Sequence, residues 1–183
     1  MRPIFVVNNH GQFNHLILRM LRDLDIEATL VSNETPAREI GEGCRGIILG
    51  GGPSLDRAGL AGSYLDLGVP VLGICLGMHI IAREQGGEVS LGRKGGYGAV
   101  EVEISDHDGI LAGYPDRIRV WASHADEVTT PPPGFSVLAH SDICGVEAMA
   151  APSGDLYGIQ WHPEVSHTQQ GELVFRNFDQ ICR

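Results

Sequence analysis

The sequence is poor in positive charge and has no long apolar run. Its 183 residues include 13 lysines and arginines against 23 aspartates and glutamates, which gives a net charge of −10. This balance disfavours nucleic acid or an anionic membrane surface as the main partner. No apolar stretch reaches the length of a transmembrane helix, and a strand-like segment follows "MRP" directly. We therefore expect neither a membrane span nor a signal peptide.

Paired cysteines are also missing. The four cysteines, Cys44, Cys75, Cys144 and Cys182, are widely spaced and form no CxxC pair. This spacing predicts neither a disulfide framework nor a zinc site, so we expect no bound metal and a location in a reducing cytoplasm. No P-loop lysine follows the glycine-rich segment and no GxGxxG opens a helix, which argues against nucleotide binding.

Apolar strand-like segments alternate with helical ones through the first half of the chain, and further strands with turns fill the second half. Early strands are predicted at 3–9, 27–32, 46–53 and 69–74, and helices at 12–24, from 36, at 57–68 and at 76–85. Later strands are predicted at 88–91, 99–104, 117–123, 135–141, 145–151 and 156–161, before a helix at 171–182. Because the early strands are continuously apolar, we expect one α/β domain over residues 1–183, with a mostly parallel sheet and added antiparallel strands.

Cys75 stands where the fourth predicted strand meets the next helix. The segment "GICLG", Gly73 to Gly77, has the spacing of a nucleophile elbow, with sulfur in place of oxygen. Side chains two positions before or after the nucleophile would clash in such a turn. The helix N-terminus favours a thiolate, and the N–H of Leu76 can donate to an oxyanion. The alternative is a buried structural cysteine between packing glycines.

Two other strand ends carry groups that suit a thiolate nucleophile. "WHPE", Trp161 to Glu164, offers His162 as a base and Glu164 as the carboxylate that fixes its tautomer, although a solvated surface turn is the alternative. "GGGPS", Gly50 to Ser54, can bring a main-chain N–H to an oxyanion, although a plain tight turn explains it as well. Because ligands bind beyond the carboxyl ends of parallel strands, we expect the three segments to converge.

In this order, "GGP", "GICLG" and "HPE" on an α/β chain resemble the class I (triad) glutamine amidotransferase family over nearly the whole sequence. The resemblance implies a flavodoxin-like three-layer sandwich that hydrolyses the side-chain amide of L-glutamine. It implies that Cys75 attacks the amide carbon, that His162 transfers protons and that Glu164 orients His162. It also implies an oxyanion hole formed by the N–H groups of Gly52 and Leu76.

Two further segments, 119–128 and 163–178, are similar to the glutaminase portion of GMP synthases with separate subunits, as in archaea. This resemblance implies no cofactor in the chain itself. It implies a heterodimer with an ATP-pyrophosphatase subunit that holds ATP and Mg, adenylylates XMP and accepts the ammonia. His79 stands where the family often has glutamine, so an imidazole of different reach and charge would make that contact. The implied substrate contacts are Gly51, His79, Ser123, His124 and Ala125.

Several alternatives stay open at this point. The ammonia acceptor could instead be an anthranilate, aminodeoxychorismate or imidazole glycerol phosphate synthase. The chain could be a non-catalytic regulatory module that has kept the fold. It could also belong to the related α/β cysteine hydrolases and chaperones, which often have histidine directly after the nucleophile, where this chain has Leu76. If it is a glutaminase, we expect low activity without the partner.

Overall fold

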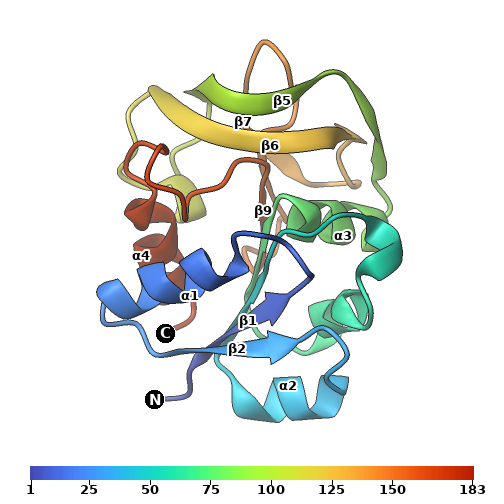
Figure 1. The fold of residues 1–183 in the computed structure, drawn as a ribbon, viewed down its shortest axis with the longest axis vertical. Helices are drawn as coiled ribbons and strands as arrows, with labels where there is room; N and C mark the ends of the chain where they lie inside the picture. Colours follow the sequence, from blue (N-terminus) through green and yellow to red (C-terminus); the bar gives the residue numbers. More distant parts are fainter.

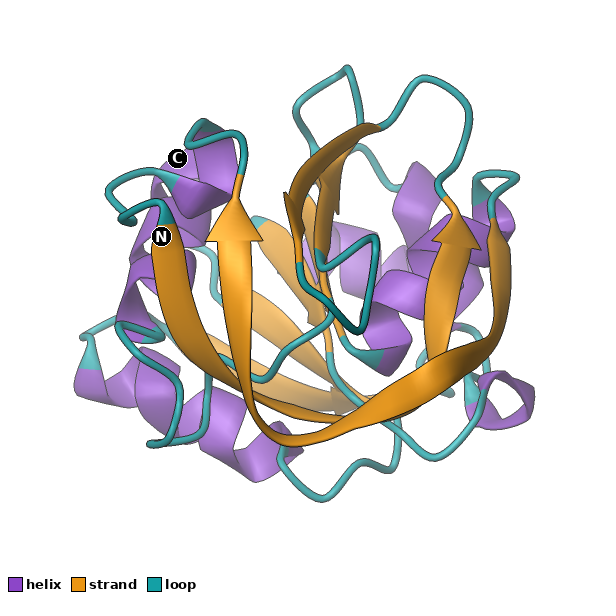
Figure 2. Cartoon of the chain, turned by 90° about the horizontal axis from the view of Figure 1, so that it is seen from above, coloured by secondary structure: helices purple, strands orange, loops and turns teal.

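The computed structural model describes residues 1–183 and contains one nine-stranded sheet with helices on both faces (Figures 1 and 2). The strands are β1 (Ile4–Asn8), β2 (Ala28–Ser32), β3 (Gly46–Leu49), β4 (Val71–Ile74), β5 (Glu88–Ile104), β6 (Arg117–Thr130), β7 (Ser136–His140), β8 (Ala148–Ala150) and β9 (Leu156–Ile159). The α-helices are α1 (Asn14–Asp23), α2 (Ala37–Gly43), α3 (Leu76–Glu84) and α4 (Glu172–Ile181), and short 3-10 helices span Leu55–Arg57, Ala61–Asp66 and Gly109–Leu111.

The strand order in the sheet is β2-β1-β3-β4-β9-β8-β7-β5-β6. Strands β2, β1, β3, β4 and β9 are parallel to one another, and β8, β7, β5 and β6 continue the sheet as antiparallel strands. The sheet therefore has a parallel part, where strands alternate with helices in the chain, and an antiparallel part made of consecutive strands. This confirms the predicted α/β class with antiparallel strands in the C-terminal half.

Neighbouring residues of the parallel strands pack on opposite faces of the sheet. On β1, Val6 belongs to the core that includes α1 and α4, whereas Val7 belongs to the core that includes α2 and α3. On β3, Ile48 and Leu49 divide in the same way. Because helices cover both faces, every residue of β3 and β4 is buried, which explains why these strands are continuously apolar.

The structure differs from the sequence-based prediction in two segments. Residues 57–68 form two short 3-10 helical pieces rather than one helix, because Gly59 adopts a φ of 55° that ends the first piece. The two strands expected at 88–91 and 99–104 are a single strand, β5, which pairs with β6 along its length. The glycine-rich stretch between them is a register shift in this ladder, between Leu91 and Gly96, rather than a turn.

The β5–β6 hairpin passes beyond the carboxyl end of β4, at the top of Figure 1. Both chain ends lie together at the other end of the molecule (Figure 1). The thiol of Cys75, directly after β4, lies 3.8 Å from the Ser123 carbonyl oxygen of β6. The edge where the parallel strands end is thus covered by the hairpin, and the candidate site lies between them. None of the helices is long and apolar enough to cross a membrane.

Candidate active site

The turn at Cys75 requires the two glycines that flank it. Cys75 has a φ of 54°, and α3 begins at the next residue. A Cβ added at Gly73 would lie 2.4 Å from the Gly77 carbonyl carbon, and one added at Gly77 would lie 2.1 Å from the Leu49 carbonyl oxygen. Only glycine fits at either position without a shift of main chain. The local structure is therefore the strained strand-to-helix elbow that the spacing predicted, with the thiol at the N-terminal end of α3.

His162 and Glu164 lie together behind the thiol. The His162 Nδ1 is 2.6 Å from the Glu164 Oε1, and both side chains are almost fully buried. The His162 main chain is held on two sides, since its N–H donates to the Trp121 carbonyl oxygen at 2.9 Å and its carbonyl oxygen accepts from the Thr168 hydroxyl at 2.6 Å. The Phe13 ring packs edge-on against the imidazole, with centroids 5.0 Å apart. The imidazole is thus held in one orientation.

The environment of His162 favours its protonated form. Burial lowers the pKa of His162, but the hydrogen bonds to Cys75 and Glu164 outweigh burial and raise that pKa to about 10. An imidazolium between a sulfur and a carboxylate stabilises negative charge on the sulfur. A proton held there can also pass to a leaving group bound at the sulfur. The three side chains together can therefore carry out nucleophilic attack and proton transfer.

The glycine-rich loop after β3 runs against both the sulfur and the imidazole. A Cβ at Gly51 would lie 3.4 Å from the His162 Cε1 and 4.0 Å from the Cys75 Cβ. The Gly52 N–H donates to no acceptor within the protein. Leu76 occupies the first turn of α3, where an N–H has no partner inside the helix. Two unused main-chain donors thus flank Cys75.

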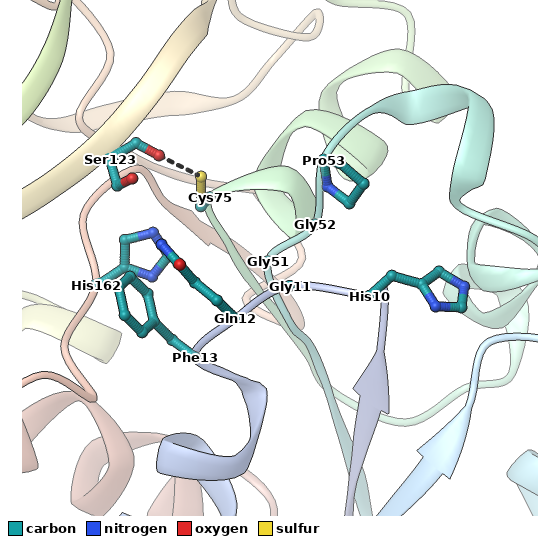
Figure 3. Close-up of a pocket in the computed structure, with 10 residues that line it drawn as sticks. All are labelled: His10, Gly11, Gln12, Phe13, Gly51, Gly52, Pro53, Cys75, Ser123 and His162. Carbon is teal, nitrogen blue, oxygen red and sulfur yellow. Dashed lines mark hydrogen bonds between the residues drawn. The ribbon is translucent and has the colours of Figure 1, made fainter.

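Two small cavities, of about 230 and 260 Å³, open on either side of Cys75. The first lies on the side of His162, between Phe13 and the glycine-rich loop (Figure 3). The second lies on the side of His79 and the β5–β6 hairpin. The residues that line both cavities are Gly52, Pro53, Cys75 and Ser123. Apart from Glu164, which lies behind His162, every site residue expected from the sequence lines one of these two cavities.

Comparison with known proteins places the chain in a family. The family model described as Glutamine amidotransferase class-I matches residues 5–181. The chain belongs to this family. A relative from Methanoculleus marisnigri, named as a glutamine-hydrolysing subunit of GMP synthase, is 68% identical over 182 residues, which cover 100% of this chain and 99% of the relative. A protein of the same name from Methanospirillum hungatei is 65% identical and is matched over 97% of its length.

Solved structures share the amidotransferase fold. The crystal structure of a putative GMP synthase subunit from Thermoplasma acidophilum superimposes with a TM-score of 0.94 at 37% identity, and the match covers 100% of this chain and 94% of that one. The glutaminase domain of the CTPS of Trypanosoma brucei, with bound acivicin, has a TM-score of 0.80 at 20% identity, with coverages of 100% and 94%. The second likeness concerns the fold alone.

In this amidotransferase, His79 contacts a residue that the sequence reasoning missed. The His79 Nε2 is 2.8 Å from the Gln160 Oε1, and the Gln160 amide nitrogen donates to the Cys75 sulfur at 3.7 Å. Burial lowers the pKa of His79, so the ring is neutral near pH 7 and its Nε2–H can donate to Gln160. The signal for Gln160 was its polarity in the apolar segment "LYGIQW", two residues before His162 and therefore directed to the same side of an extended chain.

The hairpin segment 123–125 presents main chain rather than side chains to the second cavity. The His124 ring is buried, and its Nδ1 is 2.9 Å from the Asp126 carbonyl oxygen. A Cβ at Gly96 would meet the His124 Nε2 at 2.5 Å, so this nitrogen faces β5. Burial lowers the pKa of His124, which keeps the ring neutral. The imidazole therefore supports the hairpin, and the peptide groups of 123–125 remain for ligand contacts.

The remaining histidines near the site do not join the Cys75–His162 pair. His10 points away from Cys75 in Figure 3. His167 stacks on Trp121, with ring centroids 4.7 Å apart. No three His, Cys, Asp or Glu side chains converge in a way that would hold a metal ion.

Proposed function

We propose that this chain is the glutaminase subunit of a two-subunit GMP synthase. It hydrolyses L-glutamine to glutamate and ammonia, and the ammonia passes to a separate ATP-dependent subunit that converts XMP to GMP. The observation that carries the chemistry is the convergence of Cys75, His162 and Glu164 beside two unused N–H donors. The names of the relatives that match over their whole length support the choice of acceptor.

In the first half-reaction, the Cys75 thiolate attacks the side-chain amide carbon of glutamine. A C–S bond forms, and the carbonyl oxygen becomes an oxyanion that the N–H groups of Gly52 and Leu76 stabilise. His162 then gives its proton to the amide nitrogen. The C–N bond breaks, ammonia leaves, and a glutamyl thioester remains on Cys75.

In the second half-reaction, neutral His162 accepts a proton from water as the water oxygen adds to the thioester carbon. The oxyanion forms again in the same hole. The C–S bond breaks, glutamate leaves, and the thiolate–imidazolium pair is restored. Glu164 keeps the Nδ1 proton of His162 in place through both steps, because their atoms lie 2.6 Å apart.

The two cavities beside Cys75 suit the two ends of this reaction. The second cavity, lined by the main chain of Ser123 to Ala125, takes the α-amino and carboxylate groups of glutamine, and Gly51 and His79 lie beside the reacting amide. The first cavity, which contains His162, takes the attacking water and the departing ammonia. The substrate is thereby oriented with its amide at the sulfur.

The partner in this proposal is an ATP-pyrophosphatase subunit, which holds ATP and Mg and adenylylates XMP. The glutaminase chain forms one domain that supplies ammonia to it in a cytoplasmic heterodimer. An acceptor that makes a different product is the second candidate, and no feature of the site favours it.

The test is reconstitution with the ATP-pyrophosphatase subunit of a related two-subunit GMP synthase. GMP formation from XMP and ATP is measured with glutamine or with ammonium as nitrogen source. We expect Cys75→Ala to abolish the glutamine-dependent reaction and to leave the ammonium-dependent reaction intact. Cys182→Ala is the matched control, because this thiol packs beside Gly46, at the opposite end of β3 from the glycine-rich loop.

Two outcomes would contradict the proposal in different ways. Glutamine-dependent GMP formation by Cys75→Ala would overturn the nucleophile. Glutamine hydrolysis by the wild-type chain, with no GMP formed alongside any such partner, would leave the glutaminase standing and overturn the acceptor.

A further inference from the structure

The loop that carries the Gly52 N–H has no strand partner to fix it. It follows the last residue of β3, and its peptide groups are held by side-chain amides instead. The Asn9 Nδ2 donates to the Gly50 carbonyl oxygen at 2.9 Å, and the Asn14 Nδ2 donates to the Gly51 carbonyl oxygen at 3.1 Å. Both asparagines are buried. The orientation of these two carbonyl groups therefore depends on two side chains, one just after β1 and one at the start of α1.

The contact at Gly51 also decides where the Gly52 N–H points. In a trans peptide, the C=O of one residue and the N–H of the next point in opposite directions. Because Asn14 holds the Gly51 C=O on the α1 side, the Gly52 N–H must point away from α1. Gly52 lines both cavities together with Cys75, so the opposite direction is the side of the sulfur.

The amide of Asn14 is itself oriented by a second acceptor. Its Nδ2 also donates to the Asn8 Oδ1 at 2.9 Å, so both amide hydrogens are used. Its own Oδ1 is buried and has no donor. If the amide were turned around, its oxygen would face the oxygens of Asn8 and Gly51, which would repel it. Asn14 can therefore act here only as a donor.

We propose that Asn14 is a positioning residue that keeps the Gly51–Gly52 peptide in the orientation needed to stabilise the oxyanion. The proposal rests on the glutaminase function and deepens it. If the peptide turned over, the Gly51 carbonyl oxygen would face Cys75 and would oppose the negative charge that develops there. Asn14 touches neither the sulfur nor the cavity in which the amide reacts, and it acts through the loop alone.

The test compares Asn14→Asp with Asn14→Ala. Asn14→Asp keeps the shape of the side chain but replaces the donor by an acceptor, which favours the reversed peptide. Asn14→Ala removes the donor without favouring either orientation. We expect kcat for glutamine hydrolysis to fall about 100-fold in Asn14→Asp and about tenfold in Asn14→Ala, with KM nearly unchanged. A purely structural role predicts the opposite order, because Asn14→Ala leaves a cavity and Asn14→Asp does not.

A second measurement separates the oxyanion from the thiolate. Alkylation of Cys75 by iodoacetamide proceeds without an oxyanion, so its rate should be the same in the wild type and in both variants. Affinity for the γ-aldehyde analogue of glutamine, which forms a tetrahedral adduct with the thiol, should fall in parallel with kcat. Asn177→Asp is the matched control, because Asn177 Nδ2 also donates to two main-chain carbonyl oxygens, those of Ile110 and Ala112, away from the site.

The outcomes distinguish this inference from the function on which it rests. Equal kcat values in Asn14→Asp and the wild type, or a larger loss in Asn14→Ala than in Asn14→Asp, would overturn the role of Asn14 and leave the glutaminase intact. A wild-type chain that neither hydrolyses glutamine with its partner nor binds the aldehyde would overturn the glutaminase itself.

Discussion

The two walls on either side of Cys75 are built in different ways. The loop wall, residues 50–52, has no strand partner, and asparagine side chains hold its carbonyl groups. The hairpin wall, residues 122–126 of β6, lies in a ladder of main-chain pairs with β5. N–H groups that must reach a substrate cannot also be used in a ladder. The loop wall is therefore open to donate but depends on single side chains, whereas the hairpin wall is held by its backbone.

The largest effect is expected in the loop wall. In Gly52→Ala, the new Cβ would lie 2.1 Å from the Asn9 carbonyl oxygen and 2.6 Å from a Leu76 methyl group, so the loop must shift. We expect kcat for glutamine to fall by about 100-fold or more, comparable to the loss of one oxyanion donor. Steady-state kinetics with the partner present would measure it.

Gly145→Ala is the control for this substitution. Nothing lies within 4 Å of the added Cβ, and the residue does not have a positive φ. Its kinetics should match those of the wild type. A Gly52→Ala variant with wild-type kcat would mean that the loop donates nothing to the reaction.

The next effect is expected between the walls, at His79. In His79→Ala, the Gln160 amide loses the group that fixes its oxygen, and its contact with the Cys75 sulfur loosens. We expect about a tenfold lower rate of Cys75 alkylation at pH 7, in line with the loss of one buried hydrogen bond. Intact-protein mass spectrometry would follow the reaction. If Gln160→Leu reacted at the wild-type rate, the sulfur would not depend on this contact.

A smaller effect is expected in the hairpin wall. The Tyr97 ring of β5 is 72% exposed and lines the second cavity, directly across the ladder from Ser123. In Tyr97→Ala the backbone ladder remains, so we expect kcat to stay unchanged and KM for glutamine to rise about threefold. A fall in kcat as large as that of Gly52→Ala would show that the two walls do not differ in the way described.

The smallest effect on activity is expected below the hairpin, at Glu147. Burial raises the pKa of this carboxyl to about 7, the Ser141 hydroxyl lowers it, and Glu127 raises it further. The folded protein thus binds this proton more tightly than the unfolded chain, so stability should fall as the pH rises from about 4.5 to 7, by about 3 kcal/mol at most. Glu147→Gln should remove this fall and leave glutamine kinetics unchanged.

Denaturant unfolding at pH 5 and pH 8 would measure the pH effect at Glu147. The free energy of unfolding should differ between the two pH values by less in Glu147→Gln than in the wild type. An equal difference in both proteins would mean that Glu147 does not titrate in this range.

Local pattern was enough to predict the parts of the site that depend on nearby residues. The elbow follows from the clashes that a side chain at Gly73 or Gly77 would make. The convergence of Cys75 and His162 follows from the rule that parallel strands end at one edge of a sheet, since β4 and β9 are neighbours. The layers follow from the apolar strands.

Contacts between distant segments could not be predicted in this way. Asparagine near the start of a helix is normally explained as a cap, yet the Asn14 side chain does not cap α1 and reaches residue 51 instead. The long β5 strand was divided in two because its glycines are typical of a turn, whereas pairing with β6 turns them into a register shift. In both cases a partner far away in the chain decides the outcome.

The most direct test of the nucleophile is selective labelling with a chloroketone analogue of glutamine. Burial raises the pKa of the other three thiols, Cys44, Cys144 and Cys182, which makes them poor nucleophiles near pH 7. We expect one label per chain, on Cys75, with labelling suppressed by glutamine and strongly slowed in His162→Ala. Labelling spread over several cysteines, or labelling of Cys75 that neither glutamine nor His162→Ala affects, would contradict the assignment of Cys75 and His162 as a catalytic pair.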